Sequence, residues 1–101
     1  MTTARKTTVE RRHAWKAGGL AWVYAEPGRY VCRVRTQRWQ MERRVRNPFA
    51  GIEKTGWRLV PPGSYDKGVF LAPSMRPAVD EASRLVNEHY EQRRAKGRRV
   101  A

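Results

Sequence analysis

Side chains alternate with a period of two along the chain between residues 20 and 46: in residues 20–24 large apolar residues alternate with Ala21 and Val23, and from residue 29 apolar residues alternate mainly with polar and charged ones. The alternation is interrupted at residues 26–28 (Glu-Pro-Gly), which have the composition of a tight turn, and again near residues 36–38. A period of two is typical of strands that bury one side. We therefore expect strands at residues 20–24, 29–35 and 39–46, the last two paired as an antiparallel hairpin whose largely cationic sides point the same way.

The pattern changes after residue 46. Residues 47–51 (Asn-Pro-Phe-Ala-Gly) break the alternation, and a fourth short strand is expected around Trp57 and Leu59, ended by the two prolines that follow. Residues 61–69 are expected to form a loop. Residues 69–71 (Val-Phe-Leu) fit either a brief edge strand or the start of the last helix.

A long helix is expected near the C-terminus, because apolar residues recur at the spacing of one helical face between residues 78 and 90. Ser74 is a suitable N-cap, and Pro77 suits the first turn. The acidic residues at 80 and 81 complement the positive end of the helix dipole. We expect this helix to end at Gly97, after a run of basic residues.

A second, shorter helix is expected near the N-terminus. Thr7 and Glu10 have the spacing of a capping box, in which two side chains satisfy the first free amides of a helix. The pair at residues 18–19 (Gly-Gly) would end this helix, which leaves residues 8–17. A helix of this length is marginal alone, so we expect Trp15 to fix it onto the sheet. The alternative is that this ring, which lies among basic residues, stacks on an exposed base.

These elements predict an α+β fold: a small antiparallel sheet of three to four strands, packed on one face by the amphipathic C-terminal helix, with a short N-terminal helix. The chain has 101 residues, which fits one domain, and 40% of them are hydrophobic, which is enough for one modest core. We expect residues 1–6 to be a flexible basic arm, residues 7–96 the single α+β domain, and residues 97–101 a basic tail.

The formal net charge of +13 is concentrated in three segments. Residues 1–18 and 91–101 each hold five basic residues against one acidic residue, and residues 29–46 hold seven arginines against one glutamate. Repulsion on this scale opposes compaction, and a polyanionic partner such as nucleic acid would relieve it. A GC-rich genome would also favour arginine over lysine, but it does not explain the sign of the net charge.

The hairpin at residues 29–46 carries the central hypothesis. Arg29, Arg33 and Arg35 are expected beside Gln40, Arg44 and Arg46, about 5 Å apart across the strands, in a ribbon that fits the DNA major groove. The alternative is a solvated face paired with Glu42 and Glu53. The candidate nucleic-acid contacts are Arg29, Arg33, Arg35, Arg38, Arg44 and Arg46 in the hairpin, Arg11, Arg12 and Lys16 near the N-terminus, and Arg93 and Arg94 near the C-terminus.

The remaining chemistry-bearing residues do not form a recognisable active site. His13 and His89 lack the cysteine or carboxylate neighbours of a catalytic or metal site, and His89 is expected to be half-buried on the last helix. Cys32, the single cysteine, occupies an in-facing strand position and excludes an internal disulfide. We therefore expect a protein that is not an enzyme, with no cofactor and no metal. Trp22, Trp39 and Trp57 are expected in the core.

Membrane segments are not expected either. The sequence lacks a run of about 18 apolar residues, and its N-terminus lacks the apolar stretch of a signal peptide. These features indicate a soluble, cytoplasmic protein.

Residues 28–34 (Gly-Arg-Tyr-Val-Cys-Arg-Val), followed by Trp39 and by a helix that carries Ala78 and Ala82, resemble the three-stranded-sheet-plus-helix modules of AP2-type and phage-integrase arm-binding domains. The resemblance implies that sheet residues enter the DNA major groove while the helix supports the sheet from behind. It favours Arg33, Arg35, Arg44 and Arg46 as the groove contacts. Residues 47–69 depart from this family, which has a short turn there.

Two further resemblances bear on the class of protein. Double-stranded-RNA-binding domains have a similar order of elements, but the basic cluster that opens their last helix is missing from residues 74–81. As a whole, the sequence resembles that of a small bacteriophage or actinobacterial protein.

The leading hypothesis is a small non-enzymatic nucleic-acid-binding protein, for duplex DNA in preference to RNA. The alternative is a phage-type inhibitor or adaptor that binds an acidic surface of a host protein, with Trp15, Phe49 and Tyr65 as anchors. A third option is a basic component of a virion or ribonucleoprotein particle. The sequence leaves open the choice of DNA or RNA, any sequence specificity, and a homodimer formed through a strand edge.

Overall fold

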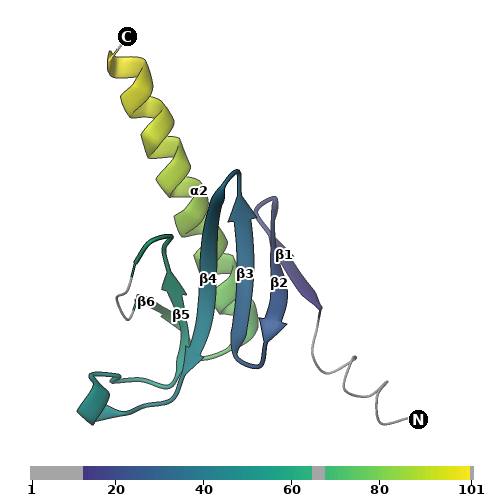
Figure 1. Ribbon diagram of the computed structural model, residues 1–101, viewed down its shortest axis with the longest axis vertical. Helices are drawn as coiled ribbons and strands as arrows, with labels where there is room; N and C mark the ends of the chain where they lie inside the picture. The colour runs from purple at the N-terminus through teal and green to yellow at the C-terminus, as the bar shows by residue number, and fades with distance from the viewer. Residues whose placement is uncertain (1–12, 65–67, 101) are drawn as a thin grey trace.

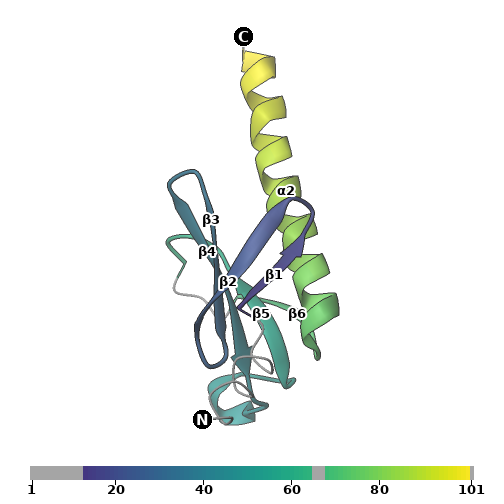
Figure 2. The ribbon, with the colours of Figure 1, turned by 90° about the vertical axis from the view of Figure 1, so that its right-hand side faces the viewer.

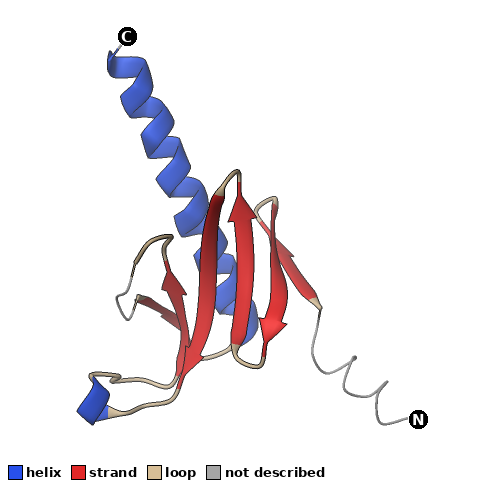
Figure 3. Ribbon diagram, in the orientation of Figure 1, coloured by secondary structure: helices blue, strands red, loops and turns tan. Residues whose placement is uncertain are grey.

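The computed structural model describes residues 13–64 and 68–100. In this part of the chain, six strands precede one long helix (Figures 1 and 3). The elements are β1 (Ala14–Ala17), β2 (Leu20–Glu26), β3 (Arg29–Val34), β4 (Gln37–Arg44), a 3₁₀ turn η1 (Pro48–Ala50), β5 (Gly56–Val60), β6 (Val69–Ala72) and α2 (Met75–Val100).

The six strands form one antiparallel sheet in which each strand pairs with the next along the chain. A flat sheet of this size would place its edges about 24 Å apart, whereas a helix with side chains is only about 10 Å wide. Both edge strands, β1 and β6, nevertheless contact α2. The sheet is therefore curled into a half-barrel around the first part of the helix, and Figure 2 shows this curl from the side.

This architecture corrects the expected sheet of three to four strands. The additional strands are β1 and β6, four residues each, at the two edges. Residues 69–71 are thus an edge strand and not the start of the helix. A glycine at position 56 permits this pairing, because a Cβ atom there would lie 2.7 Å from the carbonyl oxygen of Ala72.

The expected N-terminal helix is also wrong where the structure describes it. Residues 14–17 form β1, with Trp15 opposite Trp22 and Ala17 opposite Leu20. Gly18 and Gly19 have φ values of +58° and +77°, so they form the two-residue turn of a hairpin and not a helix end. The capping box and the remainder of that predicted helix lie outside the described residues.

The core lies between the concave face of the sheet and one face of α2. Trp22, Trp39 and Trp57 are buried there, as predicted, together with Cys32 and Met41. The helix contributes Ala78, Val79, Ala82 and Val86, all fully buried. Small helix residues against large aromatic strand residues let the two layers approach closely.

Trp15 packs against the edge of this core from β1. It is partly buried there, and the Arg76 guanidinium carbon lies 4.9 Å from its ring centroid, in a cation–π arrangement. The expected role of Trp15 in anchoring the N-terminal segment therefore applies to a strand and not to a helix.

Two buried or half-buried hydrogen bonds hold α2 on the sheet. The Trp22 indole N–H donates to Ser83 Oγ at 2.9 Å, and the Trp39 indole N–H donates to the Tyr90 hydroxyl at 3.0 Å. Beyond Tyr90, residues 91–95 are all exposed, and the helix projects past the end of the sheet (Figure 1). The helix continues to Val100, so the prediction that Gly97 ends it is wrong.

The protein measures 59 × 35 × 21 Å along its principal axes, the projecting end of α2 adding to the longest. Within the described part of the chain, α2 and the other helical segment are too short or too polar to span a membrane.

Candidate nucleic-acid interface

The hairpin of β3 and β4 distributes its arginines over both faces of the sheet. Tyr30 and Cys32 point into the core, so their neighbours Arg29 and Arg33 lie on the convex outer face. Arg33 stands directly opposite Arg38 in the register, and both are exposed. The predicted cationic face therefore exists, but its arginines differ in what surrounds them.

At one end of the hairpin, glutamates neutralise the arginines. Arg29 lies 3.3 Å from Glu26 and 3.4 Å from Glu42, and Arg44 lies 3.1 Å from the other carboxylate oxygen of Glu42. The Glu42 side chain is only 16% exposed, so solvent screens these pairs less than ordinary surface pairs. Arg29 and Arg44 thus follow the alternative interpretation, that of a face paired with carboxylates.

At the other end of the hairpin, the arginines have no such partners. Within residues 13–64 and 68–100, Arg33, Arg35 and Arg38 form no ion pair. Like charges directly across two strands repel, so the Arg33–Arg38 pair is unfavourable in the absence of an anion. This end of the hairpin is the electropositive one.

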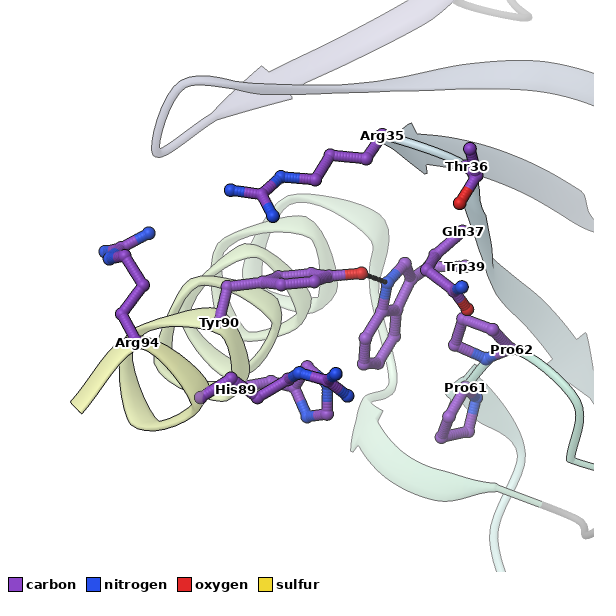
Figure 4. Close-up of a pocket in the computed structure, with 10 residues that line it drawn as sticks. Arg35, Thr36, Gln37, Trp39, Pro61, Pro62, His89, Tyr90 and Arg94 are labelled. Atoms are coloured by element: carbon purple, nitrogen blue, oxygen red, sulfur yellow. Dashed lines mark hydrogen bonds between the residues drawn. The ribbon is translucent and has the colours of Figure 1, made fainter. Parts of the chain in front are cut away.

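Arg35 does not share the face of Arg33, contrary to the expectation from strict alternation. It occupies the first position of the two-residue turn between β3 and β4, with φ at +57°, where glycine is usual. Figure 4 shows its side chain extending toward α2. The turn therefore carries the guanidinium from the sheet to the helix side of the molecule.

Arg35 lines a cleft of about 700 Å³ between the hairpin turn and α2, which we call the hairpin–helix cleft. Trp39 of β4 and Pro61 and Pro62 after β5 contribute to its walls. Residues 89–90 (His-Tyr) and 93–94 (Arg-Arg) reach it from α2 (Figure 4). Arginines that the sequence placed in a hairpin and near the end of the last helix thus meet at one site.

Three aromatic side chains form a cluster in this cleft. Trp39 is buried, and the ring centroid of His89 lies 5.2 Å from that of Trp39 in an edge-to-face arrangement. The ring centroid of Tyr90 lies 4.9 Å from that of His89. His89 is exposed and not half-buried as expected, because α2 leaves the sheet at this turn.

The chemistry of the cleft is cationic and aromatic. Its lining includes three guanidinium groups, from Arg35, Arg93 and Arg94, and no aspartate or glutamate among the residues that the structure describes. Guanidinium groups bind phosphate in bidentate fashion, and exposed rings stack on nucleic-acid bases. The arrangement is therefore suited to a ligand that is both planar and anionic.

The other predicted contacts lie elsewhere. Lys16 is exposed on the outer face of β1, and Arg46 follows β4 at the end of the hairpin opposite Arg35, with its backbone N–H donating to Thr55 Oγ1 at 2.7 Å. Arg11 and Arg12 lie outside the described residues. Of the predicted contacts that the structure describes, the cleft brings together Arg35, Arg93 and Arg94.

Sequence reasoning missed the aromatic half of the cleft. It assigned Trp39 wholly to the core, and it did not connect His89 and Tyr90 with the arginines that follow them. One signal was present: residues 89–90 and 93–94 are spaced by four, so they lie on the same side of a helix. The proximity of Pro61 and Pro62 had no signal in the sequence.

Metal or thiol chemistry has little support in the described residues. No group of three histidine, cysteine or acidic side chains there could hold a metal ion. Burial raises the pKa of the Cys32 thiol, against a smaller lowering by a hydrogen bond with the Ala21 backbone. Cys32 is therefore a poor nucleophile at neutral pH.

Comparisons with known proteins do not assign a function to this cleft. No protein-family model, no curated protein and no solved structure matches the chain.

Proposed function

We propose that this protein is a small non-enzymatic nucleic-acid-binding protein, and that its main contact surface is one end of the molecule. We call this surface the basic tip and define it by five residues: Arg33, Arg35, Arg38, Arg93 and Arg94. The observation that carries the proposal is the Arg33–Arg38 pair, two exposed arginines held directly opposite each other with no carboxylate partner in the described chain.

The contrast between the two ends of the hairpin supports this proposal. Arg29 and Arg44 are neutralised by Glu42. Carboxylates on the sheet thus offset the charge of its arginines, but only at the end away from the basic tip. Phosphate groups would supply the missing negative charge at the tip, and the release of their counterions favours binding.

The basic tip also refines the expected mode of binding. A ribbon that entered the major groove along its whole length would present Arg29 and Arg44 as well, but these two are engaged with Glu42. We therefore place the contact at the hairpin turn and the adjoining part of α2. The choice between DNA and RNA stays a prediction, with DNA preferred.

A salt titration with a charge-reversal variant tests the proposal. Affinity for a labelled oligonucleotide should fall with salt, with a slope in log–log form of about −0.9 for each duplex phosphate contacted. The double variant Arg33→Glu/Arg38→Glu should lose about a hundredfold in affinity at moderate salt, because two attractive contacts become repulsive.

The matched control is Arg43→Glu/Arg46→Glu. It makes the same change in net charge with exposed residues at the other end of the hairpin. An equal loss of affinity in both variants would mean that only the total charge matters, which would support the particle-component hypothesis and remove the basic tip as a site. Circular dichroism checks that both variants fold.

One observation favours a second candidate, the adaptor that binds an acidic protein surface. Phe49 is fully exposed on η1, in the connection between β4 and β5, and Val45 nearby is 63% exposed. Of the other expected anchors, Trp15 packs on the core and Tyr65 lies outside the described residues. Recovery of one specific protein after nuclease treatment, lost with Phe49→Ala, would favour this candidate.

A further inference from the structure

The hairpin–helix cleft has the size and lining of a small-ligand site. Its volume of about 700 Å³ lies within the usual range for such sites. A base in a duplex is stacked and paired, so only an unpaired base can enter a cleft of this size.

We infer that the cleft holds an unpaired nucleotide, and that the protein therefore prefers single-stranded nucleic acid, or a duplex with an unpaired end, over a blunt duplex. This inference rests on the proposed function. It assigns the aromatic residues of α2 a role in binding, in addition to the arginines of the basic tip.

The aromatic wall of the cleft would contact the base. His89 is exposed and Tyr90 is half-buried, so both rings offer surface to a ligand. The hydrogen bond from Trp39 to Tyr90 fixes the tyrosine in place. Pro61 and Pro62 form a rigid, uncharged part of the cleft wall. Stacking on such rings is tolerant of base identity, which predicts binding with little sequence preference.

The guanidinium groups at the rim would contact the backbone. Arg35 and Arg94 extend from different elements toward the space beside Tyr90 (Figure 4). Because no carboxylate of residues 13–64 and 68–100 lines the cleft, these groups have no competitor for a phosphate in that part of the chain. The Tyr90 hydroxyl accepts the Trp39 N–H and keeps its own proton for an acceptor on the nucleotide.

The other exposed features of the described chain give less support for a nucleotide-binding site. The groove on the outer face, of about 480 Å³, is lined by Arg33 and Arg38 of the basic tip and by aliphatic residues such as Val23 and Val31, and Tyr24 is its one ring. Nothing in the structure shows what covers Phe49. The hairpin–helix cleft differs from this groove because it offers two rings that a base can reach, those of His89 and Tyr90, beside three arginines that form no ion pair in the described chain.

The test is a comparison of three labelled probes by fluorescence anisotropy at one salt concentration: a 12-nucleotide single strand of DNA, the same sequence as RNA, and the blunt DNA duplex. We expect the full chain to bind at least one single strand about tenfold more tightly than the duplex. His89→Ala should weaken single-strand binding about tenfold and affect duplex binding much less, because a paired base cannot enter the cleft and reach this ring.

The matched control is Arg33→Ala/Arg38→Ala, which removes charge from the basic tip without touching the lining of the cleft. It should weaken all three probes by a similar factor. Photocrosslinking of a single strand carrying 4-thiothymidine, mapped by mass spectrometry, gives an independent readout and should label residues 89–90.

The outcomes separate the inference from the proposed function. Equal or tighter duplex binding, with no effect of His89→Ala, would overturn the inference and leave the nucleic-acid-binding proposal intact. No binding of any probe at low salt would overturn both. Preference for the RNA or the DNA single strand supports the inference either way and identifies the sugar that the site accepts.

Discussion

The indole N–H of Trp39 donates a hydrogen bond to the Tyr90 hydroxyl at 3.0 Å, across 51 residues of sequence. This contact joins the middle of the sheet to the part of α2 that lines the hairpin–helix cleft. The orientation of the Tyr90 ring is therefore coupled to the core. A substitution that weakens the contact should affect both stability and the shape of the cleft.

The first prediction concerns that hydrogen bond. Tyr90→Phe keeps the ring but leaves the buried Trp39 N–H without an acceptor, so the free energy of unfolding should fall by about 1–2 kcal/mol. Urea denaturation followed by tryptophan fluorescence measures this. The loss should shrink in a Trp39→Phe background, where the donor is already absent.

A related substitution calibrates this result. Ser83→Ala removes the acceptor of the Trp22 indole, and both residues are almost completely buried. Water cannot replace the acceptor there, so the loss should be at least as large as for Tyr90→Phe, about 1–3 kcal/mol. A smaller loss for Ser83→Ala than for Tyr90→Phe would contradict this account of the two contacts.

The second prediction concerns the turn between β3 and β4. Arg35 has φ at +57°, a conformation that costs an L-residue about 1 kcal/mol and glycine almost nothing. Arg35→Gly should therefore leave the stability unchanged or raise it by up to about 1 kcal/mol, and it should weaken nucleic-acid binding because the guanidinium is lost.

The control for this prediction is Arg35→Ala, which removes the same guanidinium but retains a Cβ atom. Both variants should bind equally weakly, and only the glycine variant should gain in thermal unfolding temperature. If Arg35→Ala proves as stabilising as Arg35→Gly, relief of backbone strain at this turn does not explain the gain in stability.

The central part of the fold could be predicted from the sequence because its signals are local and strong. Tyr30, Cys32, Trp39 and Met41 alternate with residues that are charged or polar except for Val31, so β3 and β4 follow from the period alone. The edge strands could not be predicted in the same way. Gly18-Gly19 fits both a helix end and a hairpin turn, and only pairing with β2 decides between them.

The candidate site could be predicted only in part. Alternation places Arg29, Arg33 and Arg44 on one face, and the structure has them there. It does not reveal that Glu42 engages two of these three. The cleft depends on how far the sheet curls and on where α2 leaves it, and both follow from packing across the whole chain.

The third prediction concerns Cys32. Burial raises the pKa of its thiol, so the folded chain keeps a proton that the unfolded chain loses at alkaline pH. Unfolding then releases a proton, and the stabilising contribution, complete at lower pH, declines as the pH rises above about 8.5. Unfolding curves between pH 7 and pH 10 should show this decline more strongly in the parent protein than in Cys32→Ala.

The alanine variant should be less stable at every pH, because it leaves a small cavity beside the core tryptophans. The comparison therefore rests on the slope against pH and not on the absolute stability. Parallel slopes for the two proteins would show that the thiol keeps its ordinary pKa in the folded state.

The last prediction separates contact at the basic tip from contact along the whole hairpin. Glu42→Gln breaks the pairs with Arg29 and Arg44, which leaves Arg29 paired with Glu26 alone and Arg44 without the carboxylate that it contacts. If phosphates followed the outer face along its length, two more contacts would form, and the log–log salt slope for duplex DNA would steepen by about 1.8. We expect the slope to stay within experimental error of the parent value, because the basic tip lies at the other end of the hairpin. The stability should fall by about 1 kcal/mol, as for ion pairs that remain partly exposed. A steeper slope together with tighter binding would instead support an interface along the whole β3–β4 hairpin, inserted into the major groove.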